Sequence, residues 1–160
     1  MNNHKAKTQL ETSQKLTAPY LFTYGTFRHP YVQKHILGRV IEGQEAVLEG
    51  YTINCAGQYY DIIEKADANV PGVILPLTEE ELDRADIWED VPLYKRCRKK
   101  VRIANGFVTA IVYVKTNRTE PFIELTDYAS LSQLSEEKLK EAIDACVASH
   151  PELQNMHKQK

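Results

Sequence analysis

The order of the predicted secondary structure elements constrains the fold of this chain more than any other feature of its sequence. Short β-branched and aromatic runs predict strands, and amphipathic periodicity predicts helices. The predicted order is a strand at 20–24, a short helix at 31–37 between Pro30 and Gly38, strands at 45–55, 59–63 and 70–77, a helix at 78–88, a hairpin at 94–103 and 107–114, and a helix at 135–150. Strands and helices do not alternate regularly. We therefore predict an α+β fold with a small mixed, mostly antiparallel, barrel-like sheet and a few flanking helices.

Glycine and proline residues mark turns and irregularities in the predicted strands. Gly50 indicates that the run at 45–55 is one strand or two strands that turn at this residue. Pro71 favours an edge or the end of a strand, because proline has no N–H group to donate to a neighbouring strand. Asn105 and Gly106 both tolerate positive φ, so they predict a type I′ turn in the hairpin.

The helix at 78–88 has the strongest local signal. Thr78 and Glu81 form a T-x-x-E capping box, in which each side chain accepts a hydrogen bond from an otherwise unpaired backbone N–H group. Leu77 before the cap and Leu82 after it form a hydrophobic staple. The start of this helix is therefore predicted at Thr78.

The chain length of 160 residues fits one compact domain. Residues 1–18 are polar and are predicted to form a mobile N-terminal segment. Residues 19–150 are predicted to form the single folded domain, and residues 151–160 a polar C-terminal tail. The sequence does not indicate an oligomeric state.

The composition argues against several classes of partner. The net charge of −2 does not favour nucleic-acid binding. The longest apolar run is shorter than the roughly 20 residues that cross a bilayer. We therefore predict no membrane partner and a cytoplasmic location. Three dispersed cysteines and five dispersed histidines lack the usual spacings of disulfide frameworks and zinc sites. We therefore predict no metal and no cofactor.

Two features suggest chemistry. Glu89 lies seven residues after Leu82, which places its carboxylate near the middle of the apolar helix face. Such a carboxylate is costly unless it is paired or has a function. The alternative is that the helix ends earlier and Glu89 points to water. The segment 24–27 ends a strand with a glycine and exposes successive N–H groups, which can form an anion-binding nest. An ordinary turn is the alternative there.

Together these segments resemble a known family. The run Leu21 to Arg28, LFTYGTFR, resembles the F-x-Y-G-T-L-R signature of the γ-glutamylcyclotransferase-like family, which includes the AIG2-like proteins. Five shorter segments follow in the same order as in the family: Ala46 to Tyr51, Val70 to Val73, Ala85 to Glu89, Tyr94 to Arg96, and Val112 to Val114. The chain departs from the family pattern at three places: Phe27 and Ala85 each replace a leucine, and Tyr59-Tyr60-Asp61 replaces Tyr-Pro-Gly.

The resemblance implies an enzyme that cyclises the γ-glutamyl group of a γ-glutamyl amine or amide to 5-oxoproline and releases the free amine. It implies that Glu89 carries the proton and that the substrate is a small γ-glutamyl molecule. The substrate-binding residues that it implies are Tyr24, Gly25, Thr26, Phe27 and Tyr113.

Several neighbouring roles stay open at this point. Core packing is an alternative role for Tyr113. Arg28 and Arg96 are interpreted as solvated, and Asp86 as a supporting or capping residue. A small-molecule binding domain without turnover is the alternative to an enzyme, and a small interaction module is a further one.

Overall fold

The computed structural model describes residues 19–56, 60–89, 93–116, 122–126 and 136–153. The predicted N-terminal segment and the tail beyond residue 153 lie outside them, as do Tyr59 and the Ser135 end of the last predicted helix. The elements are β1 (Tyr20–Thr23), the 3₁₀ turn η1 (Thr26–Arg28), α2 (Pro30–Val32), the π-helical turn η2 (Gln33–Leu37), β2 (Gln44–Asn54), β3 (Asp61–Pro76), α3 (Glu79–Glu89), β4 (Tyr94–Ile103), β5 (Gly106–Lys115) and α4 (Glu136–Ser149).

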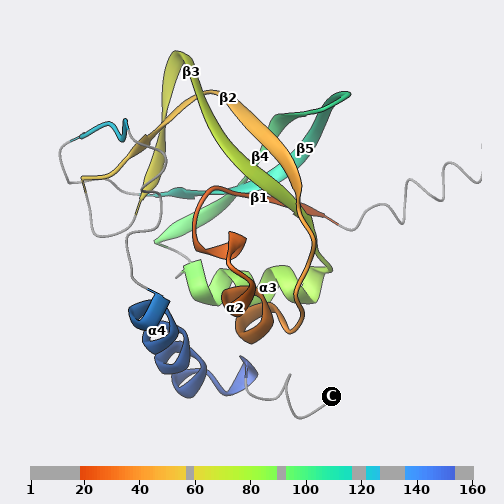
Figure 1. The fold of residues 1–160 in the computed structure, drawn as a ribbon, viewed down its shortest axis with the longest axis vertical. Helices are drawn as coiled ribbons and strands as arrows, with labels where there is room; N and C mark the ends of the chain where they lie inside the picture. The colour runs from red at the N-terminus through yellow and green to blue at the C-terminus, as the bar shows by residue number, and fades with distance from the viewer. Residues whose placement is uncertain (1–18, 57–59, 90–92, 117–121, 127–135, 154–160) are drawn as a thin grey trace, which may run out of the picture.

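The strands form a closed barrel in the order β1-β3-β2-β4-β5. All neighbouring strands are antiparallel except β1 and β5, which pair in parallel at Leu21 and Ile111 and close the barrel. The helices lie together on one side of the barrel (Figure 1). The predicted fold class, a mixed and mostly antiparallel barrel-like sheet with flanking helices, is therefore confirmed.

Period-two alternation divides the core into two clusters. In β1, Leu21 packs with residues of the helices, whereas Phe22 packs in a cluster to which every strand contributes and no helix does. In β5, Ile111 and Tyr113 face the helices, and Val112 faces the barrel interior. Successive side chains of a strand point to opposite faces of its sheet, so two adjacent residues serve two different cores. Tyr113 thus lies on the helix side of the barrel.

The structure corrects the predicted strand boundaries. The predicted strands at 59–63 and 70–77 are wrong as separate elements, because β3 runs continuously from Asp61 to Pro76. Pro71 fits inside it because β1 pairs with β3 only from Val73 onward, which leaves one edge of β3 unpaired at Pro71. β2 is also one strand, and its register shifts between Glu49 and Tyr51, around a Gly50 with φ of 84°.

The turn of the β4–β5 hairpin lies one residue earlier than predicted. Ile103 pairs with Gly106, so Ala104 and Asn105 form the loop. Neither has a positive φ, whereas Gly106 has a φ of 145°. The predicted type I′ turn at Asn105-Gly106 is therefore wrong. Gly106 is instead the first residue of β5, where its positive φ favours glycine.

None of the described helices is both long enough and apolar enough to cross a membrane.

Gly72 allows β1 and β3 to approach each other closely. A methyl group at Gly72 would lie 2.5 Å from the carbonyl oxygen of Thr23 and 2.8 Å from Cζ of Phe22. Gly72→Ala is therefore expected to lower the free energy of unfolding by about 1–3 kcal/mol, as overpacking of a core does. Urea denaturation measures this loss. Gly25→Ala is the matched control, because a methyl group there meets nothing within 4 Å. Equal losses in the two variants would contradict this reading of Gly72.

Candidate active site

The helix α3 places Glu89 at the edge of the helix-side core. The capping box forms as predicted, because Thr78 N–H donates to Glu81 at 3.0 Å and Glu81 N–H donates to Thr78 Oγ1 at 3.0 Å. Leu82 and Ala85 are fully buried on the face that packs against the barrel. α3 continues to Glu89, which is its last residue. The structure therefore does not show the alternative in which the helix ends before Glu89.

The surroundings of Glu89 favour its protonated form. Its side chain is half-buried, so it is reachable from outside, but protein groups displace much of its water. Burial, as the larger cause, and the negative charge of Asp86 together raise the pKa of Glu89 from 4.5 to about 8. Burial destabilises an isolated carboxylate because its charge loses hydration. A Glu of this kind can accept and return a proton near neutral pH.

The end of α3 lies against the segment 24–27. The indole N–H of Trp88 donates to Thr26 Oγ1 at 2.9 Å, which joins the residue before Glu89 to the predicted nest. In the described part of the chain, no protein acceptor is found for the backbone N–H groups of Thr26 and Phe27. The space beside Gly25 is open, since a methyl group there would meet nothing within 4 Å. The segment thus offers the N–H group of the part-exposed Thr26 and room for a bound group, whereas the N–H group of Phe27 is buried.

The side chains of this segment are held in the protein rather than offered to a ligand. Phe27 is 1% exposed and packs in the helix-side core. Its carbonyl accepts a hydrogen bond from Gln33 Nε2 at 2.8 Å, and Gln33 Oε1 accepts one from the N–H of Ile41. Tyr24 packs against the barrel core, with its ring centroid 6.4 Å from that of Phe22. The substitution of Phe27 for leucine therefore fills core volume and leaves the backbone donors in place.

A polar network that the sequence did not predict connects α3 with the barrel. Arg96 of β4 donates to both carboxylate oxygens of Asp86, at 2.9 and 2.7 Å. The hydroxyl of Tyr113 donates to Asp86 Oδ1 at 2.5 Å. Tyr113 is 5% exposed. Its burial raises the pKa of its hydroxyl, and so do its hydrogen bond with Asp86 and the negative charges of Asp86 and Glu89. The interpretation of Arg96 as a solvated residue is wrong, since it is committed to acidic residues of α3.

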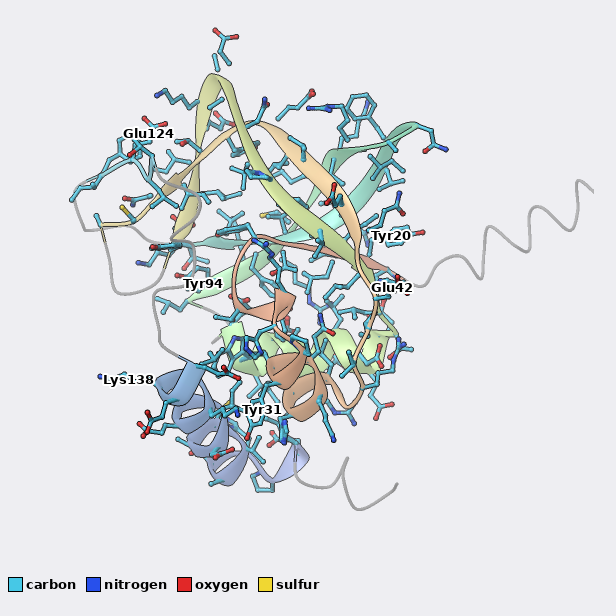
Figure 2. The ribbon with its side chains drawn as sticks, in the orientation of Figure 1. Tyr20, Tyr31, Glu42, Tyr94, Glu124 and Lys138 are labelled. Atoms are coloured by element: carbon cyan, nitrogen blue, oxygen red, sulfur yellow. The ribbon has the colours of Figure 1, made fainter. Side chains whose placement is uncertain are left out.

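In the segment that departs from the family pattern, the Asp61 side chain has a structural role and Tyr60 contributes its backbone carbonyl. The carbonyl of Tyr60 accepts a hydrogen bond from the hydroxyl of Tyr94 at 3.2 Å. Tyr94 lies where the barrel meets the helices (Figure 2). Asp61 is 1% exposed, and its carboxylate accepts a hydrogen bond from the N–H of Lys115 at 3.1 Å. These contacts fix the start of β3 against β4 and β5.

Arg28 lines a groove that neither Glu89 nor Gly25 shares. Arg28 is exposed, and Gly72 and Phe107 also line this open groove of about 720 Å³. Trp88 thus joins the end of α3, with Glu89, to the segment 24–27. Asp86 joins the same helix to Tyr113. The side chain of Arg28 does not take part in these contacts.

The chain is a small α+β barrel protein. A turn with Gly25 follows its first strand, and Glu89 ends the helix beside that turn. Residues 21–130 match the profile of the family described as Gamma-glutamyl cyclotransferase, AIG2-like. Because the match spans more than half of the chain, the protein belongs to this family, as its motifs indicated. A comparison with curated proteins finds no match.

Several solved structures share the fold. A protein from Arabidopsis thaliana has a TM-score of 0.60 and 23% identity, over 82% of this chain and 91% of that chain. An AIG2-like protein from Mus musculus has a TM-score of 0.56 and 22% identity, over 68% of this chain and 88% of that chain. A protein named gamma-glutamyl cyclotransferase has a TM-score of 0.54 and 16% identity, over 87% and 86% of the two chains. At these identities the similarity concerns the fold alone.

Proposed function

We propose that this protein is a γ-glutamylcyclotransferase-type enzyme that converts the γ-glutamyl group of a γ-glutamyl amine or amide into 5-oxoproline and releases the free amine. One observation carries the proposal: a half-buried Glu89, with a pKa raised to about 8 by burial, ends the helix whose Trp88 is bonded to Thr26 of the open turn. The family match supports the same reaction class.

The reaction is an intramolecular acyl transfer. The α-amino nitrogen of the substrate attacks its own γ-carbonyl carbon, the new C–N bond closes a five-membered lactam, and the bond to the leaving amine breaks. Both reacting groups belong to one molecule, so positioning supplies much of the acceleration. Glu89 takes a proton from the α-ammonium and passes it to the nitrogen of the leaving amine. It relays in the same way the second proton that the attacking nitrogen loses as the lactam forms, so the amine leaves as an ammonium ion. No metal or cofactor takes part in the proposed steps.

The raised pKa of Glu89 makes this proton transfer inexpensive. An α-amine has a pKa of about 8, so transfer to an unperturbed glutamate costs about 5 kcal/mol. Raising the pKa of Glu89 to about 8 removes nearly all of that difference. A carboxyl group in this setting can thus serve as base in the first step and as acid in the second.

The segment 24–27 supplies the binding contacts in this proposal. The part-exposed N–H group of Thr26 holds the α-carboxylate of the substrate or the oxyanion that forms at its γ-carbonyl, and the buried Phe27 fixes the turn behind it. Gly25 leaves room for the glutamyl group, while Tyr24 and Tyr113 support the site from the barrel, Tyr113 through its hydrogen bond to Asp86. A cytoplasmic location belongs to the proposal as well; Cys55, Cys97 and Cys146, all in the described part of the chain, form no disulfide.

A panel of candidate substrates tests the proposed function. The purified protein is incubated with γ-glutamyl amines, γ-glutamyl amino acids and glutathione, and 5-oxoproline and the released amine are measured. We expect equal amounts of both products from at least one member of the panel. Binding of panel members without any 5-oxoproline would instead identify a binding domain that lacks turnover. Absence of both binding and turnover would leave the interaction module as the better interpretation.

Gly25→Ala tests the role of the turn. A methyl group at Gly25 projects into open space in the protein alone, but into the glutamyl group of a bound substrate. We expect KM to rise by about tenfold or more, since losing 1.4 kcal/mol of binding changes an equilibrium constant tenfold. The melting temperature is measured alongside. An unchanged KM in a folded variant would remove this turn from the binding site.

A further inference from the structure

Asp86 is fixed more firmly than its expected role in capping requires. It lies one helical turn before Glu89, and residues three apart on a helix share a face. The two donors of Arg96 approach from β4 and the hydroxyl of Tyr113 approaches from β5. Because three donors from two strands hold it, the Asp86 carboxylate has one fixed position relative to the end of α3.

The charges that face Glu89 come from few groups among the described residues. Asp86 acts on it from the same helix, and Tyr113 interacts with it from β5. Arg96 of β4 bonds to Asp86 and also contacts Asp83 at 3.0 Å. On the η1 side, the contact is the uncharged hydrogen bond between Trp88 and Thr26. Asp86 is therefore the fixed anion next to Glu89, and Arg96 is the cation that partly offsets it.

We propose that Asp86 is a positioning residue of this active site: Arg96 and Tyr113 hold its carboxylate one helical turn from Glu89, where its negative charge favours the proton-carrying form of Glu89. This inference rests on the proposed function, because only a proton carrier at Glu89 gives that charge a use. Arg96 has the opposite effect, because its guanidinium pairs with Asp86 and offsets part of the negative charge that acts on Glu89.

A purely structural network would behave differently from a network that tunes Glu89. If Asp86 only joined α3 to the barrel, removing either member of the pair would lower stability and leave the titration of Glu89 unchanged. If Asp86 sets the charge around Glu89, removing the anion and removing the cation must shift the titration in opposite directions. The two variants Asp86→Asn and Arg96→Met separate these cases. Asn keeps the shape of Asp86 and an oxygen that accepts from Arg96 and Tyr113.

The experiment follows the Glu89 carboxyl by ¹³C NMR during a pH titration of the protein without substrate. We expect Asp86→Asn to lower the titration midpoint of Glu89 by about one pH unit or more and Arg96→Met to raise it. Arg84→Met is the matched control: Arg84 pairs with the exposed Glu80 earlier on the same helix, and the midpoint of Glu89 should stay in place. The acid limb of the pH profile of kcat/KM should move with the midpoint.

The outcomes distinguish this inference from the proposed function. Midpoints that stay in place in both variants, or move in the same direction, overturn the role of Asp86 even if 5-oxoproline is formed. Opposite shifts support it even if the substrate panel gives no turnover. Arg96→Lys covers the case in which Arg96→Met fails to fold. Lysine keeps the positive charge but loses the two-pronged hydrogen bond to Asp86. The titration midpoint of Glu89 should then change less than in Asp86→Asn. A shift as large as that of Asp86→Asn would contradict the inference.

Discussion

Glu89→Gln is expected to lower kcat/KM for every γ-glutamyl substrate by about 10²–10⁴-fold, the usual contribution of a positioned proton carrier. Glutamine has nearly the same shape as the protonated Glu89 but cannot exchange a proton with the substrate amine. The loss should therefore appear in kcat, while KM changes little. Steady-state release of 5-oxoproline measures both constants.

Two comparisons show whether that loss belongs to the proton transfer. Glu80→Gln removes an exposed carboxylate from the first turn of the same helix, and its kcat should match the unsubstituted protein. Glu89→Asp keeps an acid but shortens its reach by one methylene group, so its activity should fall between the two. Full activity in Glu89→Gln would exclude Glu89 from the mechanism and with it the proposed assignment of roles.

Much of the setting of Glu89 was predictable from sequence because it depends on local rules. The capping box at Thr78 fixes where α3 begins, and helical periodicity then fixes which face Glu89 shares with Leu82. A carboxylate on this apolar face is expected to be costly, and in the structure burial, with the charge of Asp86, raises the pKa of Glu89 to about 8. The glycine-containing turn after β1 was predictable for a similar reason, since it follows a short aromatic strand.

The network around Asp86 could not be predicted in the same way because it depends on tertiary register. Arg96 lies 10 residues and Tyr113 lies 27 residues from Asp86 along the chain. Arg96 and Tyr113 are register partners in β4 and β5, and this pairing brings both side chains to Asp86. One signal was available: Tyr94 and Arg96 are two apart, so both lie on the same face of their strand.

The errors in the sheet have related physical causes. Pro71 indicated an edge or the end of a strand, and it lies inside β3 at an edge that β1 is too short to reach, so the missing N–H group of proline costs no hydrogen bond there. The Asn105-Gly106 pair suggested a two-residue turn, but Ile103 and Gly106 pair with each other and shift the loop by one residue. In both cases the residue keeps its local backbone preference, but the pairing of the neighbouring strand decides where the strand or the loop ends.

Glu89→Gln is also expected to make the folded protein more stable at neutral pH. A pKa of about 8 in the folded state against 4.5 in the unfolded chain means that folding takes up a proton between these pH values. The unfolded state then binds fewer protons than the native state, so the free energy of unfolding falls as pH rises from 4.5 to 8. At one unit of pKa per 1.36 kcal/mol, the penalty at pH 7 is about 3 kcal/mol. Gln cannot ionise and does not incur that penalty.

The prediction is tested by measuring urea unfolding of the two proteins between pH 4 and pH 8. Near pH 4 the free energies of unfolding should be close, because Glu89 is protonated in both the folded and the unfolded state. Near pH 7 the Glu89→Gln protein should be the more stable one by about 3 kcal/mol. Glu80→Gln controls for the loss of a carboxylate from α3, and its difference should stay below about 1 kcal/mol, as expected for an exposed ion pair. A constant difference across this range would mean that water reaches Glu89 freely, and the physical basis of the proposed proton transfer would be lost.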